Sequence, residues 1–149
     1  MKRVDLMASC CEIWDTFEEK DNLIKEYEHW KLLLRNRNTT IGNCVAVTKR
    51  HMESFSEITS EEMAEFAQVV KDVEKALKAA FGYNKINYQM LMMKDKHTHF
   101  HILPRYSTDK YFAGIVWKDE GWPGLPVQRK EQASKEALED VKAEILKHL

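Results

Sequence analysis

Three histidines occur at every second position in the segment His97-Thr98-His99-Phe100-His101. If this segment is a β-strand, its side chains alternate between two faces, so the three imidazoles share one face. Thr98, Phe100 and Ile102 then share the other face, and Phe100 and Ile102 are typical core residues. The pattern predicts a strand over residues 97–103 with one buried face and one face of titratable rings.

Imidazole rings in such a row support two kinds of chemistry. Adjacent rings on one face lie about 6.6–6.8 Å apart and the outer two about 13 Å apart, so all three cannot bind one zinc ion at about 2.0–2.1 Å. Two of them could bind a metal with a third ligand from elsewhere. Imidazole also changes charge near neutral pH, and a neutral ring can attack phosphorus to form a covalent intermediate. A histidine-ligated metallohydrolase and an enzyme with a nucleophilic histidine both fit the residues.

The elements that must position this strand follow from hydrophobic patterning. Further strands are predicted at residues 23–27, 30–34, 43–48 and 85–92. The clearest helix runs from Thr59 to Phe81, because Thr59 and Glu62 form a capping-box pattern and Gly82 supplies the expected stop. Its predicted apolar stripe consists of Met63, Phe66, Val70, Val73, Leu77 and Phe81.

Less regular segments flank these elements. A short helix is predicted within residues 9–21, and a C-terminal helix over residues 130–149. Residues 106–126 are rich in glycine and proline, so we expect an extended loop or arm there. Pro104 is expected to end the histidine strand, because proline cannot donate to a β-ladder. The order of strands, helix, strands and helix predicts an α+β fold in one domain, with a core over about 22–106 and an arm and helix over about 107–149.

The composition argues against several classes of protein. The chain has 149 residues, with 23 Lys and Arg against 24 Asp and Glu and a net charge of −1, so a broad basic face for duplex DNA is not expected. Three cysteines without a C-x-x-C pair do not fit a disulfide framework or a four-cysteine zinc site. No apolar run suits a membrane span or a signal peptide. We expect a cytoplasmic protein without DNA or membrane partners.

The segment His97-Thr98-His99-Phe100-His101-Ile102-Leu103 resembles the histidine-triad (HIT) pattern His-φ-His-φ-His-φ-φ, with Thr98 a permissive fit to φ. Residues 42–51, which end in Lys49-Arg50-His51, the helix start at 59–62 and residues 86–91 are similar to the same family, and especially to prokaryotic members that hydrolyse dinucleoside polyphosphates. The resemblance implies a HIT-like fold, which is a mostly antiparallel sheet of about five strands with a long central helix and a C-terminal helix or arm.

The resemblance also implies an activity. The chain would be a nucleotide hydrolase or transferase that cleaves at the α-phosphate of a dinucleoside polyphosphate or a nucleoside phosphoramidate. His99 would form a covalent nucleotidyl-histidine, and His101 would contact phosphate and assist proton transfer to the leaving group. His97 would orient and polarise His99, partly through its backbone carbonyl, and His51 matches a fourth family histidine close to the triad. No metal or other cofactor would be required, and the protein would be a homodimer whose sheets join.

The chain departs from the family's pattern just before the triad. The usual phosphate-contacting stretch Gly-Gln-(Ser/Thr)-Val is replaced by Met92-Met93-Lys94-Asp95-Lys96, so a lysine would have to substitute for the missing donors. The family's ribose-binding Asn or Asp aligns near Arg35, one place before Asn36. The candidate nucleotide contacts are Asn36, Asn87, Lys94, Lys96 and Arg105.

Two further alternatives concern the arm and the activity. Arg105 is expected either to reach phosphate or to cap the end of the strand. Trp117, Trp122 and Pro123 are expected in a lid, in a base-stacking wall or in a contact with a dimer partner. Because the stretch before the triad is altered, a nucleotide-binding regulatory module with little turnover stays open as an alternative function.

Overall fold

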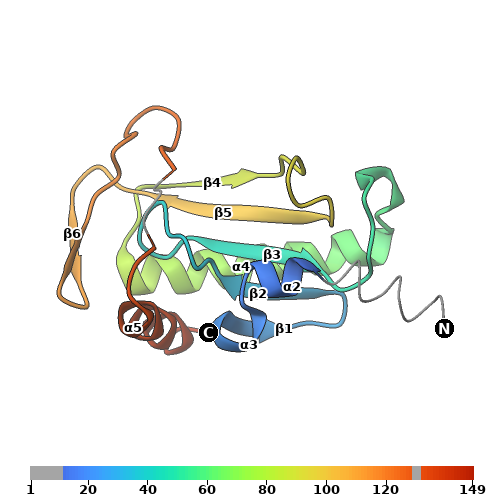
Figure 1. The fold of residues 1–149 in the computed structure, drawn as a ribbon, viewed down its shortest axis with the longest axis horizontal. Helices are drawn as coiled ribbons and strands as arrows, with labels where there is room; N and C mark the ends of the chain where they lie inside the picture. Colours follow the sequence, from blue (N-terminus) through green and yellow to red (C-terminus); the bar gives the residue numbers. More distant parts are fainter. Residues whose placement is uncertain (1–11, 129–131) are drawn as a thin grey trace.

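The computed structural model describes residues 12–128 and 132–149. Its centre is a five-stranded sheet with the order β1-β2-β3-β5-β4, in which all neighbouring strands are antiparallel (Figure 1). The strands are β1 (Leu23–Glu26), β2 (Trp30–Leu34), β3 (Cys44–Thr48), β4 (Lys85–Gln89) and β5 (His99–Arg105). The predicted α+β class and the sheet of five strands with a long helix are confirmed.

The long helix α4 (Ser60–Phe81) covers one face of the sheet. It begins with the predicted capping box between Thr59 and Glu62 and ends at Gly82 in the left-handed conformation. The predicted apolar stripe is partly wrong, because Met63 is exposed while Val69 and Ala76 are buried. Glu62 takes a buried place in the first turn, where it caps the helix, so the stripe is rotated away from Met63.

The other face of the sheet is covered by the N-terminal segment. The helix predicted within residues 9–21 consists of α2 (Glu12–Thr16) and α3 (Glu19–Asn22), and its first three residues lie outside the described part of the chain. The break falls at Glu18, which has a positive φ of 51°. A small apolar cluster joins this segment to β2 and β3 and contains Ile13, Phe17, Leu33, Val45 and Val47.

The histidine strand differs from its prediction at both ends. It begins at His99, two residues late, and continues through Pro104 to Arg105. Pro104 is tolerated because the pairing of β3 with β5 ends at Cys44 opposite Ile102, so no carbonyl of β3 needs an N–H from Pro104. On its other side Pro104 lies opposite Ile86 of β4.

The C-terminal region adds a hairpin and a helix. The expected loop over 106–126 contains β6 (Lys110–Phe112) and β7 (Ile115–Trp117), which pair as a separate two-stranded sheet. The helix α5 (Lys135–Leu146) is shorter than predicted, and residues 130 and 131 of its predicted start lie outside the described residues. Leu138, Val141 and Ile145 of α5 belong to the same buried cluster as α4. No helix within residues 12–128 or 132–149 has the length and apolar character needed to cross a membrane.

Candidate active site

His99 and His101 lie on the face of the sheet that the N-terminal segment covers. His99 is opposite Val47 and His101 is opposite Val45, so both rings point to the side of the small apolar cluster. The Phe17 ring contacts both imidazoles, with centroid distances of 5.8 and 5.9 Å. The two imidazoles are 4.9 Å apart and almost perpendicular. The shared face predicted for these two histidines is confirmed.

His97 precedes the strand, yet it fixes the ring of His99. The carbonyl oxygen of His97 lies 2.7 Å from Nδ1 of His99. Because a carbonyl only accepts, Nδ1 carries the proton and Nε2 of His99 keeps its lone pair. Burial lowers the pKa of His99, against the raising effects of this hydrogen bond and of Asp95. The ring is therefore neutral at physiological pH and nucleophilic at Nε2.

His101 is the more strongly perturbed of the two rings. Burial, and then the charges of Arg35 and His99, lower the pKa of His101 to about 3. Its Nδ1 atom is buried and has no hydrogen-bond partner among the residues that the structure describes. A neutral ring with an unused nitrogen is suited to exchange a hydrogen bond or a proton with a bound ligand.

His51 joins the triad from the loop after β3. Its Nδ1 lies 3.2 Å from Nδ1 of His97, and its Nε2 lies 2.9 Å from a carboxylate oxygen of Glu53. Nε2 of His97 lies 2.6 Å from the carbonyl oxygen of Thr48. These contacts hold the rings of His51 and His97 together beside the triad.

A cavity of about 430 Å³ lies over His99 and His101. Arg35, Arg37 and Lys94 line it, against the single carboxylate of Asp95, so its wall is mainly cationic. The remaining lining residues are Thr16, Phe17, Asn36, Leu91, Met92, Met93, Gln128 and Gln132. A cationic pocket beside a neutral imidazole favours an anionic ligand that the ring can attack.

Two of the five candidate nucleotide contacts lie in this cavity. Lys94 is one, as its place before the triad predicts. Asn36 is the other, but its amide is engaged within the protein: Nδ2 donates to the Thr16 carbonyl and to Glu18, and Oδ1 accepts from the Arg37 N–H. Asn36 therefore shapes the rim rather than offering a free amide. Lys96 is exposed and does not line the cavity.

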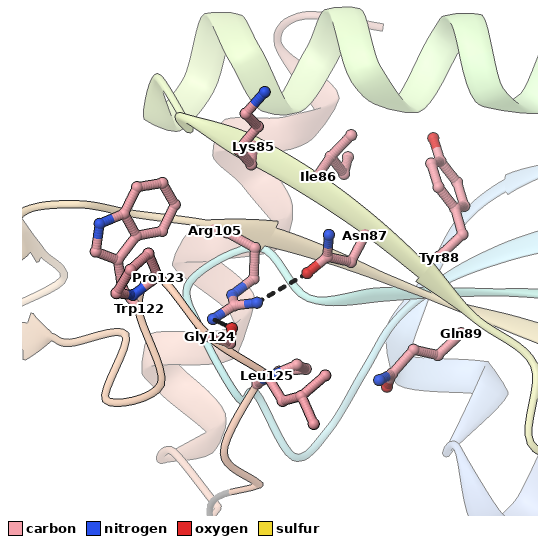
Figure 2. Close-up of a pocket in the computed structure, with 11 residues that line it drawn as sticks. Lys85, Ile86, Asn87, Tyr88, Gln89, Arg105, Trp122, Pro123, Gly124 and Leu125 are labelled. Atoms are coloured by element: carbon pink, nitrogen blue, oxygen red, sulfur yellow. Dashed lines mark hydrogen bonds between the residues drawn. The ribbon is translucent and has the colours of Figure 1, made fainter.

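Arg105 and Asn87 lie elsewhere, so the structure does not bring them to the triad. The Arg105 guanidinium forms a buried ion pair with Asp119 at 2.7 Å. It also donates to Asn87 Oδ1 and to the Gly124 carbonyl, each at 2.8 Å (Figure 2). Burial would raise the pKa of Asp119, but hydrogen bonds from Arg105 and from the Tyr106 N–H lower it. The Arg105 guanidinium thus anchors residues 119–124. It neither lines the cavity over His99 and His101, where a phosphate contact was expected, nor caps the end of β5.

That anchored segment borders a second, larger pocket of about 890 Å³ along β4, the edge strand of the sheet. Figure 2 shows Trp122, Pro123 and Leu125 facing the side chains of β4 across it. No histidine lines this pocket. The expectation for Trp117 is wrong, because this residue is 2% exposed and belongs to the main core.

Metal-ligating geometry is found away from the triad. Among the described residues, one group of three side chains brings its ligand atoms within 4.8 Å of one another, namely Glu28, His29 and Glu65. The triad histidines form no such group there. The arrangement around His99 therefore gives more support to nucleophilic chemistry than to a three-ligand metal centre.

Sequence reasoning did not identify Arg35, Arg37 and Gln128 as cavity residues. The signal for the first was present, since Arg35 follows directly after the strand β2 and its N–H donates to the Asn43 carbonyl beside β3. Because β3 alone separates β2 from the histidine strand, a charged side chain at the end of β2 can lie at the mouth of the same site. Gln128 comes from the C-terminal arm, and nothing local predicts its position.

Comparison with known proteins places this geometry in a family. The HIT domain model matches residues 16–108. An uncharacterised HIT-like protein of Methanocaldococcus jannaschii is 35% identical over 91 residues, which span 58% of this chain and 70% of that protein. An adenosine 5′-monophosphoramidase of Schizosaccharomyces pombe is 30% identical over 95 residues, which span 62% of this chain and 66% of the relative.

Solved structures agree with the fold. A histidine triad protein of Sinorhizobium meliloti has a TM-score of 0.70 at 24% identity, with 88% of this chain and 92% of that chain covered. The HIT domain match includes both the histidine strand and the cavity residues that follow β2, and it extends over more than half of the sequence. The chain belongs to the HIT domain family.

Proposed function

We propose that this chain is a nucleotide hydrolase or transferase that acts at an α-phosphate through a covalent nucleotidyl-His99. The hydrogen bond from Nδ1 of His99 to the His97 carbonyl carries the proposal, because it leaves Nε2 as the nucleophilic atom. The cationic cavity beside this ring supports an anionic substrate. Membership of the HIT family and the resemblance to an adenosine 5′-monophosphoramidase support nucleotide hydrolysis or transfer in general.

The reaction has two balanced steps. Nε2 of His99 attacks the α-phosphorus, the bond to the leaving group breaks, and the departing atom keeps that electron pair and takes a proton. His101 lies beside His99. A bound phosphate anion favours the protonated form of this ring, so His101 takes up a proton from solvent as the substrate binds and passes it from the imidazolium to the departing atom. Water then attacks the same phosphorus, the P–N bond breaks, and the proton released by water returns to His101. The products are a nucleoside monophosphate and the protonated leaving group.

The polar groups behind His99 favour the intermediate. When Nε2 bonds to phosphorus the imidazole becomes positively charged, and the His97 carbonyl oxygen is directed at its N–H. Arg35, Arg37 and Lys94 favour the phosphate charge in the same cavity. No step of this scheme uses a metal or another cofactor, and we propose that none is required.

Two substrate classes fit this scheme, a dinucleoside polyphosphate and a nucleoside phosphoramidate. The test is a panel of diadenosine triphosphate, diadenosine tetraphosphate, adenosine 5′-phosphoramidate and an adenylated sugar phosphate, assayed in chelator. We expect release of AMP from at least one of them. His99→Ala should lose this activity by at least about 10³-fold, because the nucleophile of the proposed scheme is then missing. His148→Ala, at the far end of α5, is the matched control and should keep it.

The panel also separates the alternatives. A nucleotide-binding module with little turnover is favoured by the absence of hydroxyl donors in residues 92–96, and it predicts tight AMP binding without release of product. A metallohydrolase predicts that chelator abolishes the activity. Full activity of His99→Ala would require a different nucleophile and would overturn the proposal.

We also propose that the protein is a homodimer. Among the described residues β4 has a neighbouring strand on one side only, so its other side presents backbone groups that a second β4 could pair with. The large pocket beside this edge contains the exposed side chain of Leu125. Sedimentation equilibrium should give twice the chain mass, and a concentration-independent monomer mass would contradict the proposal.

A further inference from the structure

Arg35 is a half-buried cation that lines the cavity over His99 and His101. Its backbone is held by Asn43, but its guanidinium forms no hydrogen bond and no ion pair within the described residues. The Nε atom is inaccessible to solvent and has no hydrogen-bond partner there. Because buried polar groups are almost always paired, an unpaired guanidinium beside a cavity indicates a position for an anionic ligand.

Arg35 stands at the junction of two cavities. The cavity of about 430 Å³ contains His99 and His101, and a smaller one of about 240 Å³ contains His101 but not His99. Arg35 and His101 line both. Among the described residues, the other ring or guanidinium nitrogen that is buried without a hydrogen-bond partner is Nδ1 of His101. Arg35 and His101, which line both cavities, therefore each carry one unpaired nitrogen.

The net positive charge of the side chains that line the larger cavity exceeds the negative charge of one α-phosphate. An α-phosphate esterified on one side and bonded to a leaving group on another carries a single negative charge. The larger cavity presents Arg35, Arg37 and Lys94 against Asp95 alone. Burial and then repulsion by Arg37 lower the pKa of Arg35, and the charge of Asp95 opposes this only in part. A second anionic group near Arg35 would offset this repulsion.

The smaller cavity has room for such a group. It continues past His101 to Thr39, Gln89 and Leu103, away from the nucleophile. A hydroxyl and amide groups on its wall can donate hydrogen bonds to further phosphate oxygens. The smaller cavity thus combines space, hydrogen-bond donors and the unpaired guanidinium of Arg35, and His99 does not line it.

We propose that Arg35 binds a second phosphate group of the substrate, distinct from the phosphate that His99 attacks. This inference rests on the proposed function and specifies its substrate class, a nucleotide that carries at least two phosphates. The second phosphate has two possible sources, a phosphate on the ribose and a distal phosphate on the leaving group. Both would give the Arg35 guanidinium the same kind of partner, an anionic phosphate that can accept two parallel hydrogen bonds.

The test compares substrates that differ only in the second phosphate. For the ribose source, adenosine 5′-phosphoramidate is paired with its 3′-phosphorylated form. For the leaving-group source, the AMP phosphoramidate of ethanolamine is paired with that of ethanolamine phosphate. In one of the two pairs, the kcat/KM of wild type should be about 10–100-fold higher for the substrate with two phosphates. This factor corresponds to the free energy of one charge-assisted hydrogen bond.

Variants assign this preference to Arg35. Arg35→Gln should bring the ratio close to one, whatever its absolute rates. Lys71→Gln removes one exposed positive charge on α4 and should leave the ratio unchanged. Arg35→Lys keeps the charge without the fork of donors and should retain part of the preference, and it serves as the second variant if Arg35→Gln does not fold. Equal ratios in wild type and both Arg35 variants would overturn the inference, as would a wild-type ratio near one in both pairs.

Binding to His99→Ala protein separates this inference from the proposed function. Titration calorimetry should show that either ADP or adenosine 3′,5′-bisphosphate binds more tightly than AMP. Arg35→Gln in the same background should remove this difference. If no substrate is turned over but this difference is found, the catalytic proposal fails and the second phosphate site stands. If AMP is released without any such difference, catalysis stands and the site at Arg35 is overturned.

Discussion

Nδ1 of His99 lies 2.7 Å from the backbone carbonyl oxygen of His97, two residues earlier in the chain. This contact connects the spacing of the triad to its chemistry, since the residue that leads into the strand also fixes the tautomer of the ring that follows. His97 is itself held by Thr48 and His51. Three contacts within the protein therefore orient the nucleophile. The His97 carbonyl holds the His99 ring, and Thr48 and His51 hold the His97 ring.

The fixed tautomer predicts where the intermediate forms. Wild-type protein mixed with a turned-over substrate and quenched in base should carry a nucleotidyl group on His99, because phosphorus bonded to imidazole survives base better than acid. Peptide mass spectrometry should locate the adduct on the peptide that contains residues 97–105. His101→Ala should slow release of product but still form the adduct at His99. An adduct on His101 or His51 would contradict the assignment of the nucleophile.

The low pKa of His101 predicts a pH-dependent stability. In the unfolded chain this ring takes up a proton as the pH falls below its ordinary value of 6.5, whereas burial, Arg35 and His99 keep the folded ring neutral down to about pH 3. Unfolding therefore takes up a proton in this window, and the free energy of unfolding falls as the pH drops from 6.5 towards 3. The slope from one such group is at most about 1.4 kcal/mol per pH unit.

His101→Asn removes this titration and should give a shallower dependence on pH. Urea unfolding at several pH values between about 7 and 5 measures the difference. His99, whose pKa is also lowered by burial, continues to contribute in both proteins. His148→Asn is the control for loss of a histidine outside the site and should keep the wild-type slope. Identical slopes in wild type and His101→Asn would show that the folded ring titrates normally.

Local signals in the sequence were sufficient for most of the fold. The capping residues of α4, the apolar runs of β2 and β3 and the alternation of β5 each lie within a few positions of one another, so propensity and periodicity determine them. Pro104 was misjudged because its tolerance depends on where a neighbouring strand ends, which is a tertiary fact. The hairpin β6–β7 was missed because each strand has only three residues, too few for a periodic signal.

The candidate site divides in the same way. His97, His99 and His101 are close in sequence, so their spacing alone predicted a common site. Arg105 follows the same strand but faces Asp119, a partner 14 residues away that no local pattern identifies. The family resemblance supplied His51, and its contact with His97 joins positions that are 46 residues apart. Residues such as Arg35 require knowledge of which strands are neighbours.

The buried ion pair of Arg105 and Asp119 predicts a large effect on stability and a small one on catalysis. Their side chains are 5% and 1% exposed, so Asp119→Asn leaves the guanidinium without its counter-charge. We expect a loss of about 3–5 kcal/mol in the free energy of unfolding, measured in urea. Asp109→Asn, an exposed change in the same region, should cost less than about 0.5 kcal/mol.

Activity per folded molecule distinguishes this structural role from the phosphate contact that the sequence suggested for Arg105. Because Arg105 and Asn87 lie along the second pocket and not in the cavity over His99, Asp119→Asn should keep its kcat/KM within a few-fold at a temperature where the variant is folded. Replacing both partners, as in Arg105→Met with Asp119→Leu, should restore part of the lost stability, since no buried charge is then left unpaired. A loss of kcat/KM by about 10²-fold or more in folded Asp119→Asn would instead place the 119–124 segment in the reaction.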